Sequence, residues 1–137
     1  MKISIITVVK NGLPLLKSAI KSIKNQKKIE NLEHIIVCAP STDGTEEYLD
    51  TLSDVKIIID KGSSTKFGSI NKGINIASGD IVGLLHADDV FYDEHTLYNI
   101  SQEFYDRNDV VYGNVLFCDK ENISIITREW ISSIFKK

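Results

Sequence analysis

Apolar residues along this chain gather in short runs, and segments with helical periodicity separate these runs. Four runs are rich in β-branched residues, as buried parallel strands are, and they cover residues 2–9, 33–39, 55–60 and 80–87. Segments with helical character lie between and after them, within residues 13–26, 40–52, 67–78 and 93–107. This alternation predicts an α/β sandwich with a mostly parallel central sheet.

The same pattern makes local predictions. Ile70, Ile74 and Ala77 recur at helical spacing and are predicted to face the core. Asp43, with Glu46 three residues later, has the spacing of a capping box and is predicted to be an N-cap. Two later runs, 109–119 and 123–129, are also predicted to be strands, whereas the pattern assigns no element to residues 130–137.

Polar clusters follow three of the predicted strands at their carboxyl ends. They are Lys10-Asn11-Gly12, Ser41-Thr42-Asp43-Gly44 and His86-Ala87-Asp88-Asp89. In open parallel sheets, ligands bind outside the carboxyl ends of the strands. The pattern therefore places the three clusters at the mouth of the expected crevice.

The adjacent carboxylates of Asp88 and Asp89 need a countercharge, because neighbouring like charges disfavour ionisation. Two interpretations are open from the residues alone. In one, Asp88 caps the following turn and water surrounds Asp89. In the other, a cation binds between them.

Composition restricts the class of protein. A length of 137 residues suits one domain, here taken as residues 1–137, and a net charge of −3 gives no reason to expect a nucleic-acid partner. No apolar stretch approaches the length of about 20 residues that a membrane span needs. The apolar run near the N-terminus lacks the features of a leader, so we expect a cytoplasmic protein. Cys38 and Cys118 form no CxxC pair and are predicted to be reduced and buried.

Charge is uneven along the chain. Residues 10–28 contain six lysines and no acid, and Lys17, Lys21, Lys24 and Lys28 fall on one face of the first predicted helix. This face is either simply solvated or loosely attracted to an anionic membrane or a phosphate-bearing substrate. A location at the inner face of the membrane is the corresponding alternative for the whole protein.

Four stretches in order resemble the family 2 glycosyltransferases with a GT-A fold, in particular those of bacterial polysaccharide synthesis. They are SIITVVKNGLPLLKSAIKSIKNQ, HIIVCAPSTDGT, INKGINIASGDIVGLLHADD and VVYGNVLF. The resemblance covers roughly residues 2–119. It implies a Rossmann-like α/β/α domain that binds a nucleoside-diphosphate sugar, usually a UDP- or dTDP-sugar. The sugar would be transferred, with inversion, to a saccharide or lipid-linked acceptor.

The resemblance also implies roles for single residues. Thr7 and Val9 would line the base pocket, and Asp88 would meet the ribose or the metal. Asp89 would hold Mn²⁺ or Mg²⁺ against the diphosphate, which is chemistry that carboxylates and a hard cation perform well. The nucleotide-sugar-binding residues taken over from the matched stretches are Asn11, Asp43, Asn71 and Lys72.

Several positions depart from the family pattern. Relatives commonly have an acid at the end of the second strand that recognises the base, whereas this chain has Cys38, Ala39 and Pro40. Recognition of the nucleotide base would then be weakened, altered or taken over by a neighbour such as Asp43. His86 replaces a frequent acid before the aspartate pair and is either a metal ligand or an ordinary hydrogen-bonding residue. Lys66 or Lys72 would serve the phosphates in place of an expected arginine.

Relatives of this type are about twice as long, and their second half supplies the acceptor pocket and the general base. Asp119, Glu121 and Glu129 do not match that base, so no catalytic residue is assigned. An apolar patch left where the second half packs would favour a homodimer. Trp130, Ile131, Ile134 and Phe135 either cover this patch or belong to the core. Two functions stay open: a metal-dependent glycosyltransferase or its donor-binding half, and an inactive nucleotide-sugar-binding or scaffold module that partners a complete transferase.

Overall fold

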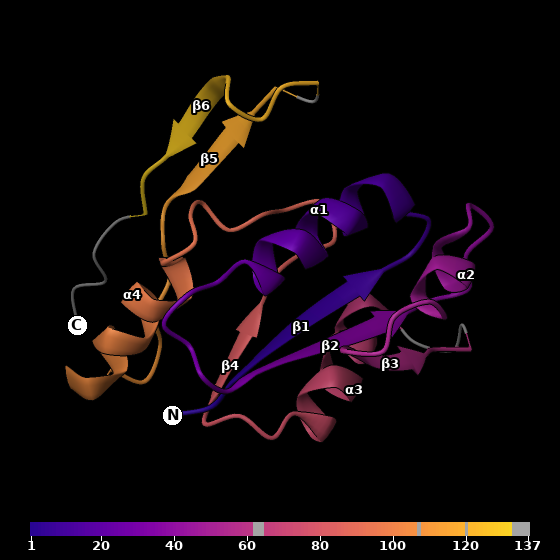
Figure 1. Ribbon diagram of the computed structural model, residues 1–137, viewed down its shortest axis with the longest axis horizontal. Coiled ribbons are helices and arrows are strands. Elements are labelled where there is room, and N and C mark those ends of the chain that lie inside the picture. Colours follow the sequence, from indigo (N-terminus) through magenta and orange to yellow (C-terminus); the bar gives the residue numbers. More distant parts are fainter. Residues whose placement is uncertain (62–64, 107, 120, 133–137) are drawn as a thin grey trace. The chain divides into compact units, whose positions relative to one another are not determined.

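A computed structural model describes residues 1–61, 65–106, 108–119 and 121–132. The chain divides into two compact units, Met1–Ser101 and Gln102–Lys137, and each is described by itself. The first unit contains a four-stranded sheet in the order β3-β2-β1-β4 (Figure 1). Its strands are β1 (Ile3–Val9), β2 (Leu32–Cys38), β3 (Lys56–Ile59) and β4 (Ile81–Leu84). All neighbouring strands are parallel, so the predicted α/β architecture is confirmed.

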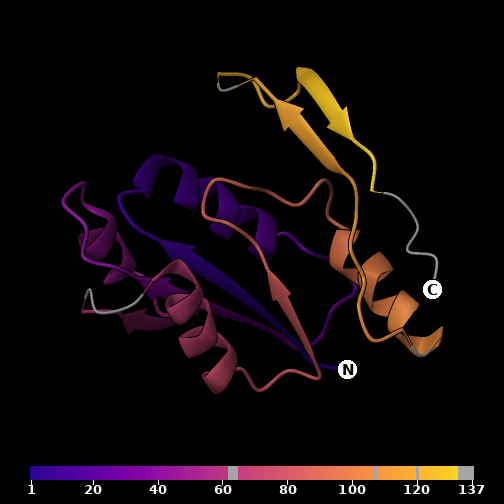
Figure 2. The same cartoon turned by 180° about the vertical axis from the view of Figure 1, so that it is seen from behind.

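Helices α1 (Leu13–Lys24) and α2 (Thr45–Leu49) pack on one face of this sheet, and α3 (Lys66–Ile76) packs on the other. Figures 1 and 2 show α1 and α3 on opposite sides of the strands. Helix α4 (Thr96–Glu103) follows β4 after a long connection. None of the helices in the described ranges is both long and apolar enough to cross a membrane.

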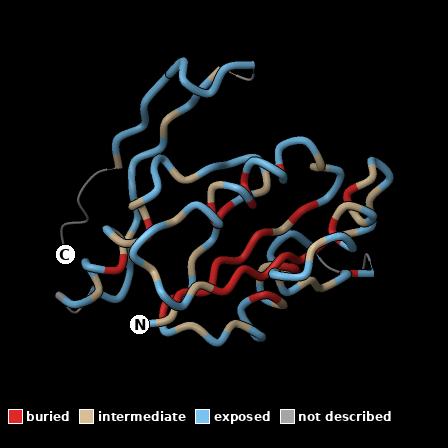
Figure 3. Tube along the Cα trace, viewed as in Figure 1, coloured by how far each residue is buried: buried red, intermediate tan, exposed pale blue. Residues whose placement is uncertain are grey.

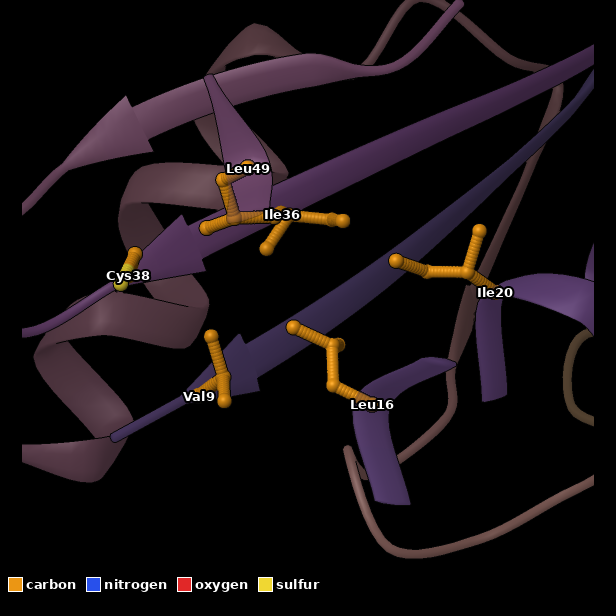
Figure 4. Close-up of a cluster of buried hydrophobic side chains, with 6 residues drawn as sticks. All are labelled: Val9, Leu16, Ile20, Ile36, Cys38 and Leu49. Carbon is orange, nitrogen blue, oxygen red and sulfur yellow. The ribbon is translucent and has the colours of Figure 1, made fainter. Parts of the chain in front are cut away.

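The core lies around β1 and β2, whose residues are almost all buried (Figure 3). On the face covered by α1 and α2, side chains from both strands and both helices form one cluster (Figure 4). Its buried members are Val9, Leu16, Ile20, Ile36, Cys38 and Leu49. Burial of branched apolar side chains contributes about 1.5–3 kcal/mol each relative to exposure, so this cluster fixes α1 and α2 on the sheet.

Helix α3 presents a different face to the sheet than its periodicity predicts. Its buried residues are Ser69 and Gly73, whereas Ile74 is exposed, so the prediction for Ile74 is wrong. A Cβ atom at position 73 would lie 2.6 Å from Cγ2 of Ile6, which shows that the glycine allows the helix backbone to approach β1. Close backbone packing therefore takes the place that a large apolar side chain was expected to fill.

The predicted basic face of α1 is present, but most of its lysines have partners. Lys24 is paired with Asp54 at 2.8 Å and Lys27 with Glu94 at 2.7 Å. The ammonium groups of two others lie over aromatic rings, Lys17 over Tyr48 and Lys28 over Tyr98. These contacts within the first unit account for four of the six lysines that the sequence gathers there.

The second unit contains a short 3₁₀ helix, η1 (Phe104–Asp106), and an antiparallel hairpin of β5 (Val115–Cys118) and β6 (Ile126–Trp130). Of the strand predicted at 109–119, only the last part forms.

Cys118 is exposed, so the prediction that both cysteines are buried holds for Cys38 alone. Ile131 and Trp130 are exposed, while Ile134 and Phe135 lie outside the described residues.

Two polar residues are buried where β2 begins. Glu33 accepts hydrogen bonds from the hydroxyls of Ser4 and Ser78, and its carboxylate pairs with Lys56. Burial alone would raise the pKa of Glu33, but these donors outweigh it and hold the pKa far below its usual value. His34 lies on the opposite face, with Nε2 3.0 Å from Oγ1 of Thr7. Its Nδ1 has no hydrogen-bond partner among the described residues.

The burial of His34 predicts a pH dependence of stability. Burial, reinforced by Lys24, lowers the pKa of His34 from 6.5 to about 4, although Asp54 acts in the opposite direction. The unfolded chain then binds a proton that the folded chain excludes, so stability is complete above pH 6.5 and falls as the pH drops toward 4. The slope is at most about 1.4 kcal/mol per pH unit, for a total of about 2–3 kcal/mol. Urea unfolding at a series of pH values should show this slope.

In His34→Gln the slope of the unfolding free energy against pH, between pH 6.5 and 4, should decrease by up to about 1.4 kcal/mol per pH unit, the equivalent of one proton. This holds whatever the overall stability of the variant. His95→Gln, which removes a histidine that is less buried, serves as the control. An unchanged slope in His34→Gln would show that His34 titrates normally in the folded chain.

Candidate functional site

The predicted site residues follow β1, β2 and β4, whose carboxyl ends lie at one edge of the sheet. Val9 is in register with Cys38, and Ile6 is in register with Leu84. Beyond the strands, the N–H of Ala39 donates to the carbonyl of Val9 (2.9 Å) and the N–H of Asp60 donates to the carbonyl of Cys38 (2.7 Å). The pairing thus brings the polar ends of β1, β2 and β3 together. The sequence pattern predicted this arrangement for neighbouring parallel strands.

Asn11 connects the loops that follow β1 and β2. Its N–H donates to Oγ of Ser41 (3.0 Å), and its side-chain Oδ1 accepts from the N–H of Thr42 (2.8 Å). The residue has a φ of 50°, a left-handed conformation that asparagine tolerates better than most residues. The geometry gives Asn11 a role in joining the two loops, and its predicted role in donor binding stays a prediction.

Asp43 makes a second connection between these loops. Oδ2 accepts from the N–H of Leu13 (3.0 Å), the first residue of α1, and Oδ1 accepts from the N–H of Thr45 (3.1 Å) and from its hydroxyl. The hydroxyl of Thr45 and these backbone donors lower the pKa of Asp43, so its carboxylate is ionised at neutral pH.

The cap of α2 differs from the predicted capping box. The N-cap position is Gly44, one residue later than predicted, in a left-handed conformation with a φ of 87°. Asp43, one residue before the N-cap, still accepts a hydrogen bond from the N–H of Thr45. The side chain of Glu46 accepts one from the N–H of Ser41 (2.8 Å). A glycine reaches this φ without steric cost, which lets the loop turn into the helix.

Thr7 and Val9, predicted to line the base pocket, are both buried in the face under α1. Thr7 is hydrogen-bonded to His34, and Val9 belongs to the apolar cluster of α1 and α2. Cys38 is also buried there, and this burial raises the pKa of its thiol, as do the nearby charges of Glu46 and Asp43. The end of β2 therefore holds a neutral thiol where the family resemblance led us to expect an acid.

Asp88 and Asp89 lie in a turn just beyond β4, which the N–H of Asp89 closes by donating to the carbonyl of His86 (3.1 Å). Both side chains are exposed. The surrounding protein nevertheless removes part of the water around Asp89 and raises its pKa, and the charge of Asp88 raises it further. His86 and Lys66 act in the opposite direction but do not outweigh these effects. The pair is thus short of positive charge.

A divalent ion would fit this deficit, although the protein ligands are few. In the ranges that the structure describes, no group of three or more histidine, cysteine, aspartate or glutamate side chains could hold a metal ion. Mg²⁺ and similar ions are commonly held by one or two carboxylates while water and substrate phosphates complete the coordination. The two aspartates suit that second kind of site, which forms fully only with its substrate.

Asp60 is a functional candidate that the sequence interpretation missed. It follows β3 at the same edge, is 2% exposed, and accepts hydrogen bonds from Oγ of Ser69 (2.7 Å) and Nζ of Lys72 (2.8 Å). Lys72, predicted to serve the phosphates, therefore has its ammonium group on Asp60 in this structure, while the neighbouring Asn71 is exposed. A signal was available, because Asp60 directly follows an apolar run, and acids close behind an apolar run also drew attention to Asp88 and Asp89.

A separate hollow of about 470 Å³ opens at the amino ends of β2 and β3. Glu33, His34 and Lys56 are among its lining residues. It contains none of the residues predicted to bind the donor, so it is not part of the candidate site.

The sequence model of the family described as Glycosyl transferase family 2 matches residues 4–137, nearly the whole chain. The chain belongs to this family. Two curated relatives, both uncharacterized glycosyltransferases from strains of Mycobacterium tuberculosis, are 30% identical to it over 90 residues. That alignment covers 65% of this chain and 34% of each relative, so the chain spans about a third of the length of these relatives.

Solved structures confirm the GT-A fold. The mannosyltransferase PcManGT from Pyrobaculum calidifontis, in complex with GDP-Man and Mn²⁺, is 25% identical with a TM-score of 0.68; the match covers 87% of this chain and 35% of that one. S. aureus TarS 1-349, in complex with UDP-GlcNAc, is 20% identical with a TM-score of 0.67; the match covers 77% of this chain and 32% of that one. The family 2 chain therefore has the expected Rossmann-like α/β architecture.

The hydroxyl of Thr45 yields a first prediction for this edge of the sheet. It is fully buried, accepts from the N–H of Gly12 (3.3 Å) and donates to Asp43. Thr45→Val keeps the shape but removes both hydrogen bonds of the buried hydroxyl, so we expect a loss of about 1–3 kcal/mol in the free energy of unfolding. Urea unfolding measures this, with Thr42→Val at an exposed position as the control. A loss equal to that of the control would show that the hydroxyl does not join the loops.

The Asp60–Lys72 pair yields a second prediction, an asymmetry between its partners. The side chain of Asp60 is 1% exposed and that of Lys72 is 40% exposed. In Asp60→Asn, water can solvate the released ammonium group, whereas Lys72→Met leaves a buried carboxylate without its cation. We therefore expect Lys72→Met to cost about 3 kcal/mol and Asp60→Asn about half of that.

Urea unfolding of both variants tests this order, and Lys61→Met at an exposed position is the matched control. If Asp60→Asn proved the more destabilising, the hydrogen bonds of Asp60 rather than its charge would be the stabilising element.

Proposed function

We propose that this chain is the donor-binding part of a metal-dependent glycosyltransferase that uses a nucleoside-diphosphate sugar. The observation that carries the proposal is the pair of exposed carboxylates, Asp88 and Asp89, beyond β4 in a family 2 chain. Partial desolvation, and then the charge of Asp88, raise the pKa of Asp89, so a divalent cation placed there gains favourable interaction with both carboxylates. PcManGT, whose structure contains GDP-Man and Mn²⁺, supports this choice of ion and ligand class.

The residues of the chain would divide the work as follows. Asp89, with Asp88, holds Mn²⁺ or Mg²⁺, and Asp88 also reaches the ribose. The ion supplies positive charge for a diphosphate leaving group. Asn11 and Asp43 keep the loops after β1 and β2 in place, and Lys66, whose charge already acts on Asp89, contributes to the same electrostatic field. Asn71 and Lys72 of α3 face the donor, with Lys72 held by Asp60 in the absence of ligand.

Further details of the reaction rest on the family resemblance. The donor is a UDP- or dTDP-sugar, the acceptor is a saccharide or a lipid-linked saccharide, and transfer proceeds with inversion. The general base is assigned to no residue of this chain. The protein acts in the cytoplasm, and contact of the basic face of α1 with the inner face of the membrane is the alternative to a face that is simply solvated.

A second candidate function is a nucleotide-sugar-binding or scaffold module without activity. The neutral thiol of Cys38 favours this function, because a thiol in place of the expected acid is a weak hydrogen-bond partner for the N–H of a nucleotide base. No general base is recognised either, and Oδ1 of Asp119 is engaged within its own turn, where it accepts the N–H groups of Glu121 and Asn122.

Isothermal titration of the chain with UDP, dTDP and GDP, each with and without Mn²⁺, tests the proposal. We expect binding of at least one nucleotide that strengthens with Mn²⁺. In Asp89→Asn the affinity with Mn²⁺ should fall at least about tenfold, or about 1.4 kcal/mol. The control is Glu30→Gln, at the opposite edge of the sheet.

The outcomes separate the candidate functions. Metal-dependent binding together with sugar-donor hydrolysis or transfer supports the enzyme, and metal-dependent binding alone supports the module. A folded chain that binds none of the three nucleotides would contradict both.

A further inference from the structure

The segment that follows the two aspartates is held by the end of α1. In the described structure, residues 90–95 form neither helix nor strand, so secondary structure does not fix their place. The polar main-chain groups of such a segment need partners elsewhere in the fold. Here those partners come from the last turn of α1 and the two residues after the helix, all within the first unit.

Gln26 uses its whole side-chain amide in this contact. Nε2 donates to the carbonyls of Ser22 (3.2 Å) and Asp93 (2.7 Å), and Oε1 accepts from the N–H of Leu97 (2.9 Å). These partners fix the orientation of the amide, because a carbonyl can only accept and an N–H can only donate. One side chain thus ties the segment to α1 at two points, four residues after Asp89 and in the first turn of α4.

Two neighbours of Gln26 add to the contact. The N–H of Lys27 donates to the carbonyl of Glu94 (2.7 Å), and the two side chains form an ion pair. This pair is exposed on both sides, so it contributes little. The hydroxyl of Ser22 accepts the N–H of Phe91, but at 3.3 Å this bond is long. Among the side chains of the contact, Gln26 therefore makes the strongest attachment.

The two aspartates are also attached to α1 on their other side. Ala87 packs against the apolar cluster to which α1 contributes Leu16 and Ile20. A Cβ atom at Gly12, just before α1, would lie 3.8 Å from Cβ of Ala87. Asp88 and Asp89 thus lie between one attachment near the start of α1 and another at its end. Losing either attachment would leave the pair joined to the chain but no longer fixed in place.

We propose that Gln26 is a positioning residue for Asp88 and Asp89, because it fixes the segment that follows them and so the place of both carboxylates. Gln26 itself touches neither aspartate nor ligand in this arrangement. The inference deepens the proposed function and rests on it, since the place of the carboxylates affects binding only if a cation comes to them. An ion that has few protein ligands binds more weakly when those ligands hold the right arrangement for only part of the time.

Titration calorimetry of the full chain with UDP, dTDP and GDP, each with and without Mn²⁺, measures this effect. Gln26→Leu keeps the size of the side chain and removes its hydrogen bonds, and Asn25→Leu, at the neighbouring exposed amide, is the matched control. If the released carboxylates are correctly placed about a fifth of the time, the ratio of affinities with and without Mn²⁺ falls about fivefold in Gln26→Leu. Partial unfolding would lower both affinities alike and leave this ratio unchanged.

Amide exchange followed by NMR, without nucleotide or metal, tests the attachment alone. The N–H of Asp89 donates within its own turn and that of Phe91 to a hydroxyl of α1, so neither is bonded to Gln26. In Gln26→Leu both should exchange at least about threefold faster, because the segment opens locally. The increase should exceed that of Ile36 in the buried strand β2, since a general loss of stability would affect Ile36 as much. Asn25→Leu should change none of these rates.

The two measurements separate this inference from the proposed function. A lower ratio of affinities together with faster exchange at Asp89 in Gln26→Leu supports the inference. An unchanged ratio, or exchange at Asp89 that rises no more than at Ile36, overturns it. If the unaltered chain binds no nucleotide more tightly with Mn²⁺, the proposed function fails. Exchange then decides alone: a local increase at Asp89 supports Gln26 as the residue that holds the pair, and its absence overturns that role.

Discussion

The candidate site depends on the central position of β1 between β2 and β4. Because all three strands run in the same direction, their polar ends must emerge at one edge of the sheet. The apolar cluster under α1 and α2 holds this arrangement from one side, and the close contact of Gly73 with Ile6 holds it from the other. Hydrogen bonds from Asn11 and Asp43 then join the loops after β1 and β2, so the edge is rigid where a ligand would approach.

Most of the architecture could be predicted from the sequence, because strands buried on both faces produce continuous β-branched runs. The face of α3 could not. Periodicity assumes that large apolar residues point inward, but here Ser69 is buried against Asp60 and Gly73 against β1, so Ile74 is left outside. Both strands of the second unit were predicted, although β5 is shorter than the run at 109–119. The exposure of Cys118 was beyond the pattern, since two strands alone bury little of either face.

The site was predictable only in part, for a different reason. Asp88 and Asp89 were singled out because two adjacent acids after an apolar run need a countercharge, and their role as a cation site stays a prediction. Asn11 and Asp43 were read as donor ligands, yet their oxygens accept main-chain N–H groups about 30 residues away in sequence, and no local pattern reveals such partners. Asp60 directly follows β3, whereas Leu85, His86 and Ala87 separate β4 from Asp88. The cation of Asp60 lies on a helix that begins six residues later, so its compensation is visible only in the folded chain.

The carboxylates at this edge differ in whether the protein compensates their charge, and that difference separates structure from function. Asp43 has backbone and hydroxyl donors that lower its pKa, and Asp60 has Lys72 and Ser69. Asp89 has neither; partial desolvation and Asp88 raise its pKa instead. A fold that supplies donors to two acids and leaves a neighbouring pair without them carries an electrostatic cost at that pair, and a bound cation would remove it. Local rules that fail at one place in an otherwise consistent structure often mark a functional site, and this supports the proposal that Asp88 and Asp89 bind a cation.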